Sequence, residues 1–255
     1  MPAVGSAEPR GIVSSSSVTP HKAFFGADPV RVLFSLDPAE VVGPATVDVL
    51  FIRRGNRNRV SWKATLGAVV PGAPREVRWR GLTSRGRAAR DGRYRVFVQP
   101  TDAPVGERES IGSFRLHGHS FPVRGRHWDR GWLGLFGAPR GKRRRHEGFD
   151  VMAPCGTPLV AARAGRVISR GYDPVLYGNY LRIAASNEHR SYFYSHLSSP
   201  ARPVRGERVA TGQTLGRVGR TGNARTIGCH LHFEIRERGR AIDPRRSLMR
   251  WDRFS

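Results

Sequence analysis

Two histidines separated by a single residue lie near the C-terminus, in the segment GCHLHFEI at positions 228–235. Polar His230, His232 and Glu234 alternate there with apolar residues, and a period of two is typical of a β-strand. Both imidazoles are therefore expected on one face of a sheet, about 6.6 Å apart along the strand, where they can flank a metal ion with its bound water. A single His-x-His pair is more often a half-exposed strand without a ligand, so the interpretation depends on the other candidate ligands.

Two further segments offer side chains of the same kind. The segment HEGFD at 146–150 places His146 and Asp150 four residues apart, and Gly148 between them argues against a helical zinc-protease motif. It is better interpreted as a loop that enters a strand. The segment YFYSHL at 192–197 has the composition of a strand, with His196 near its end.

A catalytic zinc ion commonly has three N, O or S ligands from the protein and one position for water. His146, Asp150 and either His230 or His232 complete that number. The remaining histidine of the pair and His196 would then lie near the water.

These motifs, in this order and with the glycine-rich turn GRTGN at 219–223, resemble those of the lysostaphin-type (LytM-like) zinc endopeptidases of bacterial cell walls. The segments PCGTPL at 154–159 and VRGERVATGQ at 204–213 are also similar to the family pattern. The resemblance covers about residues 121–244.

The resemblance implies that His146, Asp150 and His232 bind zinc, and that His196 and His230 are the catalytic histidines. Zinc lowers the pKa of its water to about 7, so a neutral imidazole beside it can accept the water's proton and pass it to the leaving amine. Which histidine is the base stays open. Glu234 is either a hydrogen-bond partner that orients a ring or a plain surface carboxylate.

Cys155 and Cys229 are the only cysteines, and both fall close to the implied metal site. We predict a disulfide between them, which suits an oxidising extracellular compartment. The alternative is a pair of buried, unpaired cysteines.

The predicted fold is all-β, in four parts. Residues 1–28 are expected to be a flexible leader. Residues 29–117 have short alternating strands separated by turns, and they are expected to form an immunoglobulin-like β-sandwich that serves as a binding or spacer module. Part of this sandwich, residues 79–96, loosely resembles the Ig-like repeat of flagellar-hook-cap proteins. Residues 118–145 are predicted to be a basic, glycine-rich linker at the entry to the catalytic domain, and residues 146–255 an antiparallel β-sheet zinc peptidase. The second His-x-His, at His117 and His119, has glycine between its rings and adjoins the linker, so it is not expected to bind metal.

The formal charge of +24 arises from 44 basic residues, of which all but three are arginine. Such a chain attracts polyanions, and anionic cell-wall polymers are the expected partners. No aromatic-basic recognition motif indicates specific nucleic-acid binding, and no apolar segment is long enough to span a membrane.

The predicted function is zinc-dependent hydrolysis of peptidoglycan cross-bridges, outside the cell or in its envelope. The alternative is a non-catalytic or latent wall-binding protein that activates another hydrolase. The presence of all five candidate site residues argues against that alternative.

Overall fold

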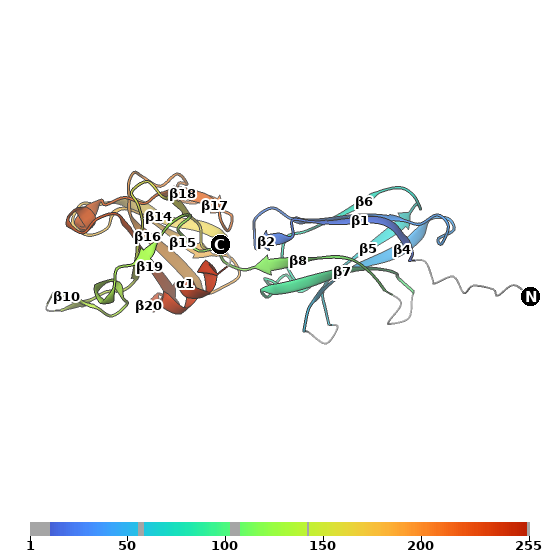
Figure 1. Cartoon of the computed structure of the whole chain (residues 1–255), viewed down its shortest axis with the longest axis horizontal. Helices are drawn as coiled ribbons and strands as arrows, with labels where there is room; N and C mark the ends of the chain where they lie inside the picture. The colour runs from blue at the N-terminus through green and yellow to red at the C-terminus, as the bar shows by residue number, and fades with distance from the viewer. Residues whose placement is uncertain (1–10, 56–58, 103–107, 142, 254–255) are drawn as a thin grey trace, which may run out of the picture. The chain divides into compact units, whose positions relative to one another are not determined.

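The computed structural model describes residues 11–55, 59–102, 108–141 and 143–253. The chain divides into two compact units (Figure 1). The N-terminal unit holds the residues up to Ala23 together with Asp28–His117, and the C-terminal unit holds Phe24–Ala27 and the residues from Gly118 onward.

The N-terminal unit consists of two antiparallel sheets. One has the order β1-β3-β6, with β1 at Val13–Thr19, β3 at Val30–Leu36 and β6 at Arg75–Trp79. The other has the order β2-β8-β7-β4-β5, formed by Lys22–Phe24, Glu109–His117, Gly92–Pro100, Ala45–Arg53 and Val60–Val69.

Alternating apolar residues of both sheets form one core around the buried indole of Trp79. The indole packs against Phe51 and Phe114 at ring-centroid distances of 5.0 and 5.5 Å, and its Nε1 donates a hydrogen bond to the Leu82 carbonyl at 2.6 Å. The all-β prediction with antiparallel sheets is thus confirmed, whereas the immunoglobulin-like assignment stays a prediction.

The predicted flexible leader is wrong from Val13 onward, while residues 1–10 lie outside the described residues. Strand β1 pairs with β3, and Val18 is its one buried residue. The serines of β1 leave no apolar alternation for a sequence pattern to detect. Backbone hydrogen bonds to β3 hold the strand instead, with help from the Ser16 hydroxyl, which donates to the Ile111 carbonyl at 3.0 Å.

The C-terminal unit is built on an antiparallel sheet of order β17-β14-β15-β16-β19-β12-β9, with β20 paired to β19. In that order the strands are Arg208–Val209, Gly165–Asp173, Gly178–Ala185, Arg190–Leu197, His230–Glu237, Phe149–Met152 and Trp128–Asp129, and β20 is Arg240–Ile242. Two small sheets pair β10 (Pro139–Arg140) with β11 (Arg144–Arg145) and β13 (Pro158–Val160) with β18 (Thr214–Arg217).

Short helical segments complete this unit. They are the 3-10 turns η1 (Trp132–Gly134) and η2 (Gly222–Thr226) and the helix α1 (Arg245–Asp252), whose Trp251 packs against Phe233 at 6.3 Å between ring centroids. No helix in the described part of the chain is long and apolar enough to cross a membrane.

The segment predicted as a linker, residues 118–145, is part of this unit. Phe121 and Val123 lie in its core, and β9, β10 and β11 arise from the same segment. Arg140, Arg144 and Arg145, which suggested a linker, lie within β10 and β11. These strands of two residues each are too brief for a periodic pattern.

Candidate metal centre

Strand β19 separates apolar from polar side chains as the alternation predicts. Leu231, Phe233 and Ile235 are buried in the core of the C-terminal unit. On the opposite face, His230, His232 and Glu234 line a cavity of about 340 Å³. The neighbouring strand β12 places Asp150 directly opposite His232, so the carboxylate and the imidazole share that face.

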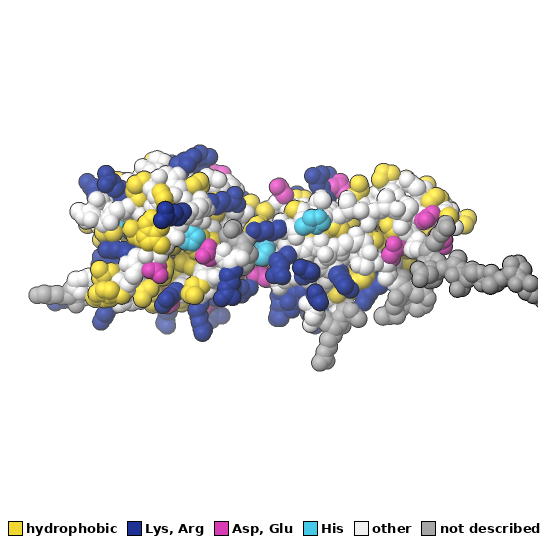
Figure 2. Space-filling view, viewed as in Figure 1, with side chains coloured by type: hydrophobic (Ala, Val, Ile, Leu, Met, Phe, Trp, Pro, Cys, Tyr) yellow, Lys and Arg dark blue, Asp and Glu magenta, His cyan; other side chains and the backbone are white. Residues whose placement is uncertain are grey.

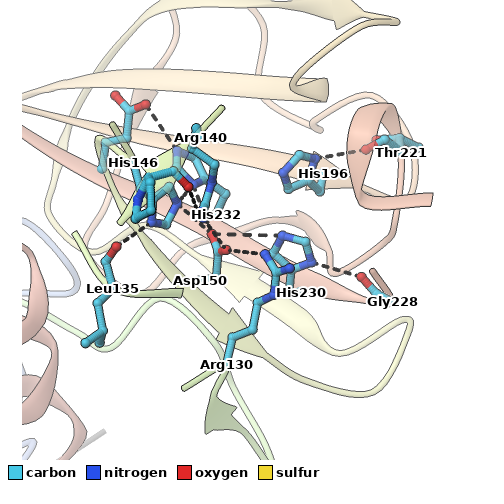
Figure 3. A network of polar contacts seen from close by, with 12 residues as sticks. Arg130, Leu135, Arg140, His146, Asp150, His196, Thr221, Gly228, His230 and His232 are labelled. Atoms are coloured by element: carbon cyan, nitrogen blue, oxygen red, sulfur yellow. Dashed lines mark hydrogen bonds and ion pairs between the residues drawn. The ribbon is translucent and has the colours of Figure 1, made fainter. Parts of the chain in front are cut away.

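His146, Asp150 and His232 converge on one point (Figure 3). His146 Nε2 lies 2.8 Å from His232 Nδ1 and 2.9 Å from Asp150 Oδ1, and His232 Nδ1 lies 3.1 Å from the same carboxylate oxygen. All three residues are buried.

The outer nitrogen of each ring is already engaged. His146 Nδ1 lies 2.8 Å from the Leu135 carbonyl, and His232 Nε2 lies 3.2 Å from a carboxylate oxygen of Glu234. Since a carbonyl and a carboxylate accept hydrogen bonds, each outer nitrogen carries a proton. Each inner nitrogen faces Asp150: when protonated it donates a hydrogen bond to the carboxylate, and when deprotonated it offers a lone pair to a metal ion. Two inner nitrogens and one carboxylate oxygen within about 3 Å of one another share either protons or a metal ion, and two nitrogens with one oxygen suit zinc.

The second oxygen of Asp150 is held by two arginines. Arg130 and Arg140 donate to Oδ2 at 3.1 and 3.3 Å. Burial alone raises the pKa of Asp150, but its hydrogen bonds with His146 and His232 outweigh burial and hold the pKa well below its usual range. Sequence reasoning missed both arginines, because two arginines among 41 carry no signal.

The centre attracts positive charge even without a metal. Burial lowers the pKa of His232, but hydrogen bonds to Asp150 and Glu234 overcome this and raise the pKa to about 9. Glu234 itself is buried and also accepts a hydrogen bond from Arg236 Nε at 2.8 Å, so it lies beside the His232 ring and not on the surface.

His196 and His230 lie beside this centre, with their ring centroids 4.7 Å apart. Each directs Nδ1 at a backbone carbonyl at 2.9 Å, Thr221 for His196 and Gly228 for His230 (Figure 3). Each Nε2 therefore keeps a lone pair. Burial, followed by the nearby His230 and His232, lowers the pKa of His196 to about 3, and burial also lowers the pKa of His230. Both rings are neutral proton acceptors near pH 7.

A β-bulge turns His196 toward the centre. The β15–β16 ladder pairs Asn179 with Leu197 but Leu181 with Tyr194, so two residues of β16 face one residue of β15. In a regular strand His196 would follow Tyr194 into the core. Its φ of 64°, a left-handed conformation that costs about 1–2 kcal/mol outside glycine, places its ring against His230 instead.

The two cysteines form a disulfide with a Cα–Cα distance of 5.2 Å. This bond joins the loop after β12 to the residue that precedes His230, and so links the two strands that carry the metal-centre residues. His119 lies elsewhere, stacked on Trp251 at 4.6 Å and 3.0 Å from the Tyr192 hydroxyl.

The family model of Peptidase family M23 matches residues 144–244. The chain is 42% identical over 106 residues to the peptidoglycan DD-endopeptidase ShyC of Vibrio cholerae. The aligned segment covers 41% of this chain and 23% of that protein. It is 38% identical over 104 residues to the uncharacterized lipoprotein YgeR of Escherichia coli, covering 40% of this chain and 39% of the relative.

A third relative is the L-Ala–D-Glu endopeptidase of Bacillus subtilis, 31% identical over 159 residues that cover 57% of this chain and 48% of the relative. The chain thus spans less than half the length of these three curated relatives. Among solved structures, the catalytic domain of lysostaphin from Staphylococcus simulans is 28% identical with a TM-score of 0.41, over 46% of this chain and 89% of that one.

Proposed function

We propose that residues 144–244, which match the model of Peptidase family M23, form a peptidase domain of that family, and that the chain is a zinc-dependent endopeptidase that hydrolyses peptide cross-bridges of peptidoglycan. Relatives named peptidoglycan DD-endopeptidase and L-Ala–D-Glu endopeptidase support this substrate class. The observation that carries the proposal is the convergence of His146 Nε2, Asp150 Oδ1 and His232 Nδ1 with both outer ring nitrogens already hydrogen-bonded.

His146, Asp150 and His232 are the proposed zinc ligands. The Leu135 carbonyl and Glu234 fix the tautomer of each imidazole, which keeps the inner nitrogens free to bind. Arg130 and Arg140 hold the carboxylate of Asp150 in place through its other oxygen. A bound zinc ion supplies Lewis-acid activation of a water molecule and of the scissile carbonyl group.

His196 and His230 are the proposed catalytic histidines, and their chemistry is proton transfer at Nε2. One accepts the proton of the attacking water and passes it to the leaving amine. The other, once protonated, donates a hydrogen bond to the carbonyl oxygen as negative charge develops there. Each ring directs Nδ1 at a backbone carbonyl at 2.9 Å, so the hydrogen bond at Nδ1 does not decide which histidine has which role.

We place this activity in the cell envelope or outside the cell. The disulfide between Cys155 and Cys229 supports an oxidising compartment. The net charge of +24 supports retention on anionic wall polymers, through a long-range attraction that added salt weakens.

Mass spectrometry of the products from purified peptidoglycan tests the proposal. We expect soluble fragments with new peptide amino and carboxyl termini and intact glycan bonds, absent when His146→Ala replaces the wild type. Binding to the wall without any new peptide terminus would support the alternative of a wall-binding protein that activates another hydrolase.

A further inference from the structure

The N-terminal unit contains a cavity of about 480 Å³ that is rich in arginine. It is bordered by the end of β4, the start of β5, the loop before β7 and the start of β7. Five of its eleven lining residues are arginines, namely Arg53, Arg59, Arg85, Arg87 and Arg90. Figure 2 shows basic side chains gathered on one side of this unit.

The lining includes no aspartate or glutamate. Arg85, Arg87 and Arg90 are exposed, and within the described part of the chain none of them forms an ion pair. Arg53 Nη1 donates to the carbonyl oxygen of Asp91 at 3.4 Å. Four of these arginines, Arg53, Arg85, Arg87 and Arg90, therefore share one cavity whose lining holds no carboxylate. They outnumber the neighbouring Asp91, so a local positive potential remains that an external anion can neutralise.

Hydroxyl groups and a fixed turn accompany the arginines. Ser61, Thr83 and Ser84 line the same cavity. Two hydrogen bonds close the turn that presents Arg85 and Arg87: Thr83 N–H donates to the Arg87 carbonyl at 2.7 Å, and Gly86 N–H donates to the Thr83 carbonyl at 2.9 Å. Guanidinium groups combined with hydroxyl donors suit the oxygens of a phosphate group.

The cavity lacks the features of a nucleic-acid site. Tyr94 is its one aromatic lining residue, and that side chain is 1% exposed, with its hydroxyl donating to the Arg90 carbonyl at 2.7 Å. No ring in the lining is therefore available to stack on a base, the interaction that single-stranded nucleic acids commonly require.

We propose that this cavity binds phosphodiester groups of an anionic cell-wall polymer and thereby retains the chain at the wall. The phosphate chemistry follows from the cavity alone, and only the choice of a wall polymer as its source rests on the proposed function.

Calorimetric titration of the full chain with a glycerol phosphate oligomer of defined length tests this site. We compare wild type with the double variant Arg85→Gln/Arg87→Gln. The control is Arg93→Gln/Arg115→Gln, which removes two exposed arginines that pair across β7 and β8 outside the cavity. All four positions are exposed, so both double variants are expected to fold.

We expect the cavity variant to lose roughly tenfold in affinity and the control variant to change little. Equal losses in the two variants would overturn the proposal, because binding would then follow net charge alone. An oligothymidylate with the same number of phosphates that binds as tightly, with the same loss in the cavity variant, would overturn the wall polymer as the source.

The titration contains no peptide substrate and uses chelator-treated protein, so its result is independent of catalysis. Peptide-bond hydrolysis measured in parallel on a soluble wall peptide is expected to be equal in the two double variants. If the wild type hydrolyses the peptide but does not bind the glycerol phosphate oligomer, only the phosphodiester site is refuted. If it binds the oligomer with the expected loss in the cavity variant but hydrolyses no peptide bond, only the endopeptidase is refuted.

Discussion

Replacing Asp150 with asparagine tests two roles of this residue, as a proposed metal ligand and as the hydrogen-bond acceptor of Arg130 and Arg140. In the wild type, Oδ1 faces His146 and His232, and Oδ2 accepts hydrogen bonds from Arg130 and Arg140. Each of the two oxygens must therefore offer lone pairs, Oδ2 to the arginine N–H groups and Oδ1 to the imidazoles or the proposed metal ion. An asparagine side chain has nearly the same shape but only one acceptor oxygen, so its NH2 group must face either the two arginines or the proposed metal position.

The magnitude follows from burial. The Asp150 side chain is 3% exposed and each arginine side chain is 22% exposed, so the variant leaves two largely buried guanidinium groups without their anion. Breaking a buried ion pair on one side costs about 3 kcal/mol in the free energy of unfolding of the zinc-free protein. Loss of a ligand lowers zinc affinity by at least about a hundredfold, since changes in residues that merely orient ligands already cost up to that amount.

Urea denaturation of the zinc-free protein and competition with a chromophoric zinc chelator measure the two effects. Asp129→Asn is the matched control, because Asp129 is exposed and an asparagine oxygen can still accept the hydrogen bond from Gly131 N–H. Unchanged zinc affinity in Asp150→Asn would refute the assignment of Asp150 as a ligand. Unchanged stability would refute the role given to Arg130 and Arg140.

Four other predictions follow from the same geometry. His196→Ala and His230→Ala should each retain zinc but lose about 10²–10⁴-fold in kcat/KM, measured as amine release, and loss of zinc from either would contradict their placement as catalytic residues. Glu234→Gln should weaken zinc binding by about 10–100-fold in the chelator competition, with Glu237→Gln on the same strand as the unaffected control. Because the folded state holds the pKa of His196 near 3, zinc-free protein should lose stability as pH falls from about 6.5 toward 3, and His196→Gln should reduce that slope in pH-dependent denaturation. The disulfide spans 74 residues, so Cys155→Ser/Cys229→Ser should lower the free energy of unfolding by about 4 kcal/mol, and an unchanged value would contradict a stabilising disulfide.

The sequence carried most of the information about strand β19. Its strict alternation predicts that His230, His232 and Glu234 share a face, and the structure places all three on the face opposite the core. The same reasoning fails at His196, because a bulge reverses the face of a single residue and no residue type in the segment marks it. The sequence offered His196 as a candidate near a strand end, and the resemblance to a family gave it the catalytic role.

Other features depend on tertiary contacts that have no local pattern. Strand β1 is held by backbone pairing along a serine-rich segment, where hydrophobic alternation is absent. Arg130 and Arg140 become partners of Asp150 only when β9 and the β10–β11 hairpin fold next to β12, and nothing in the sequence separates them from other arginines.

The most direct test of the central claim is zinc content together with amine release from purified peptidoglycan, for wild type and His232→Ala purified without chelator. The account predicts about one zinc per chain and release of new amino groups in the wild type, with both lost in the variant. A wild-type protein that releases amines without bound zinc, or that binds no zinc and releases none, would contradict it.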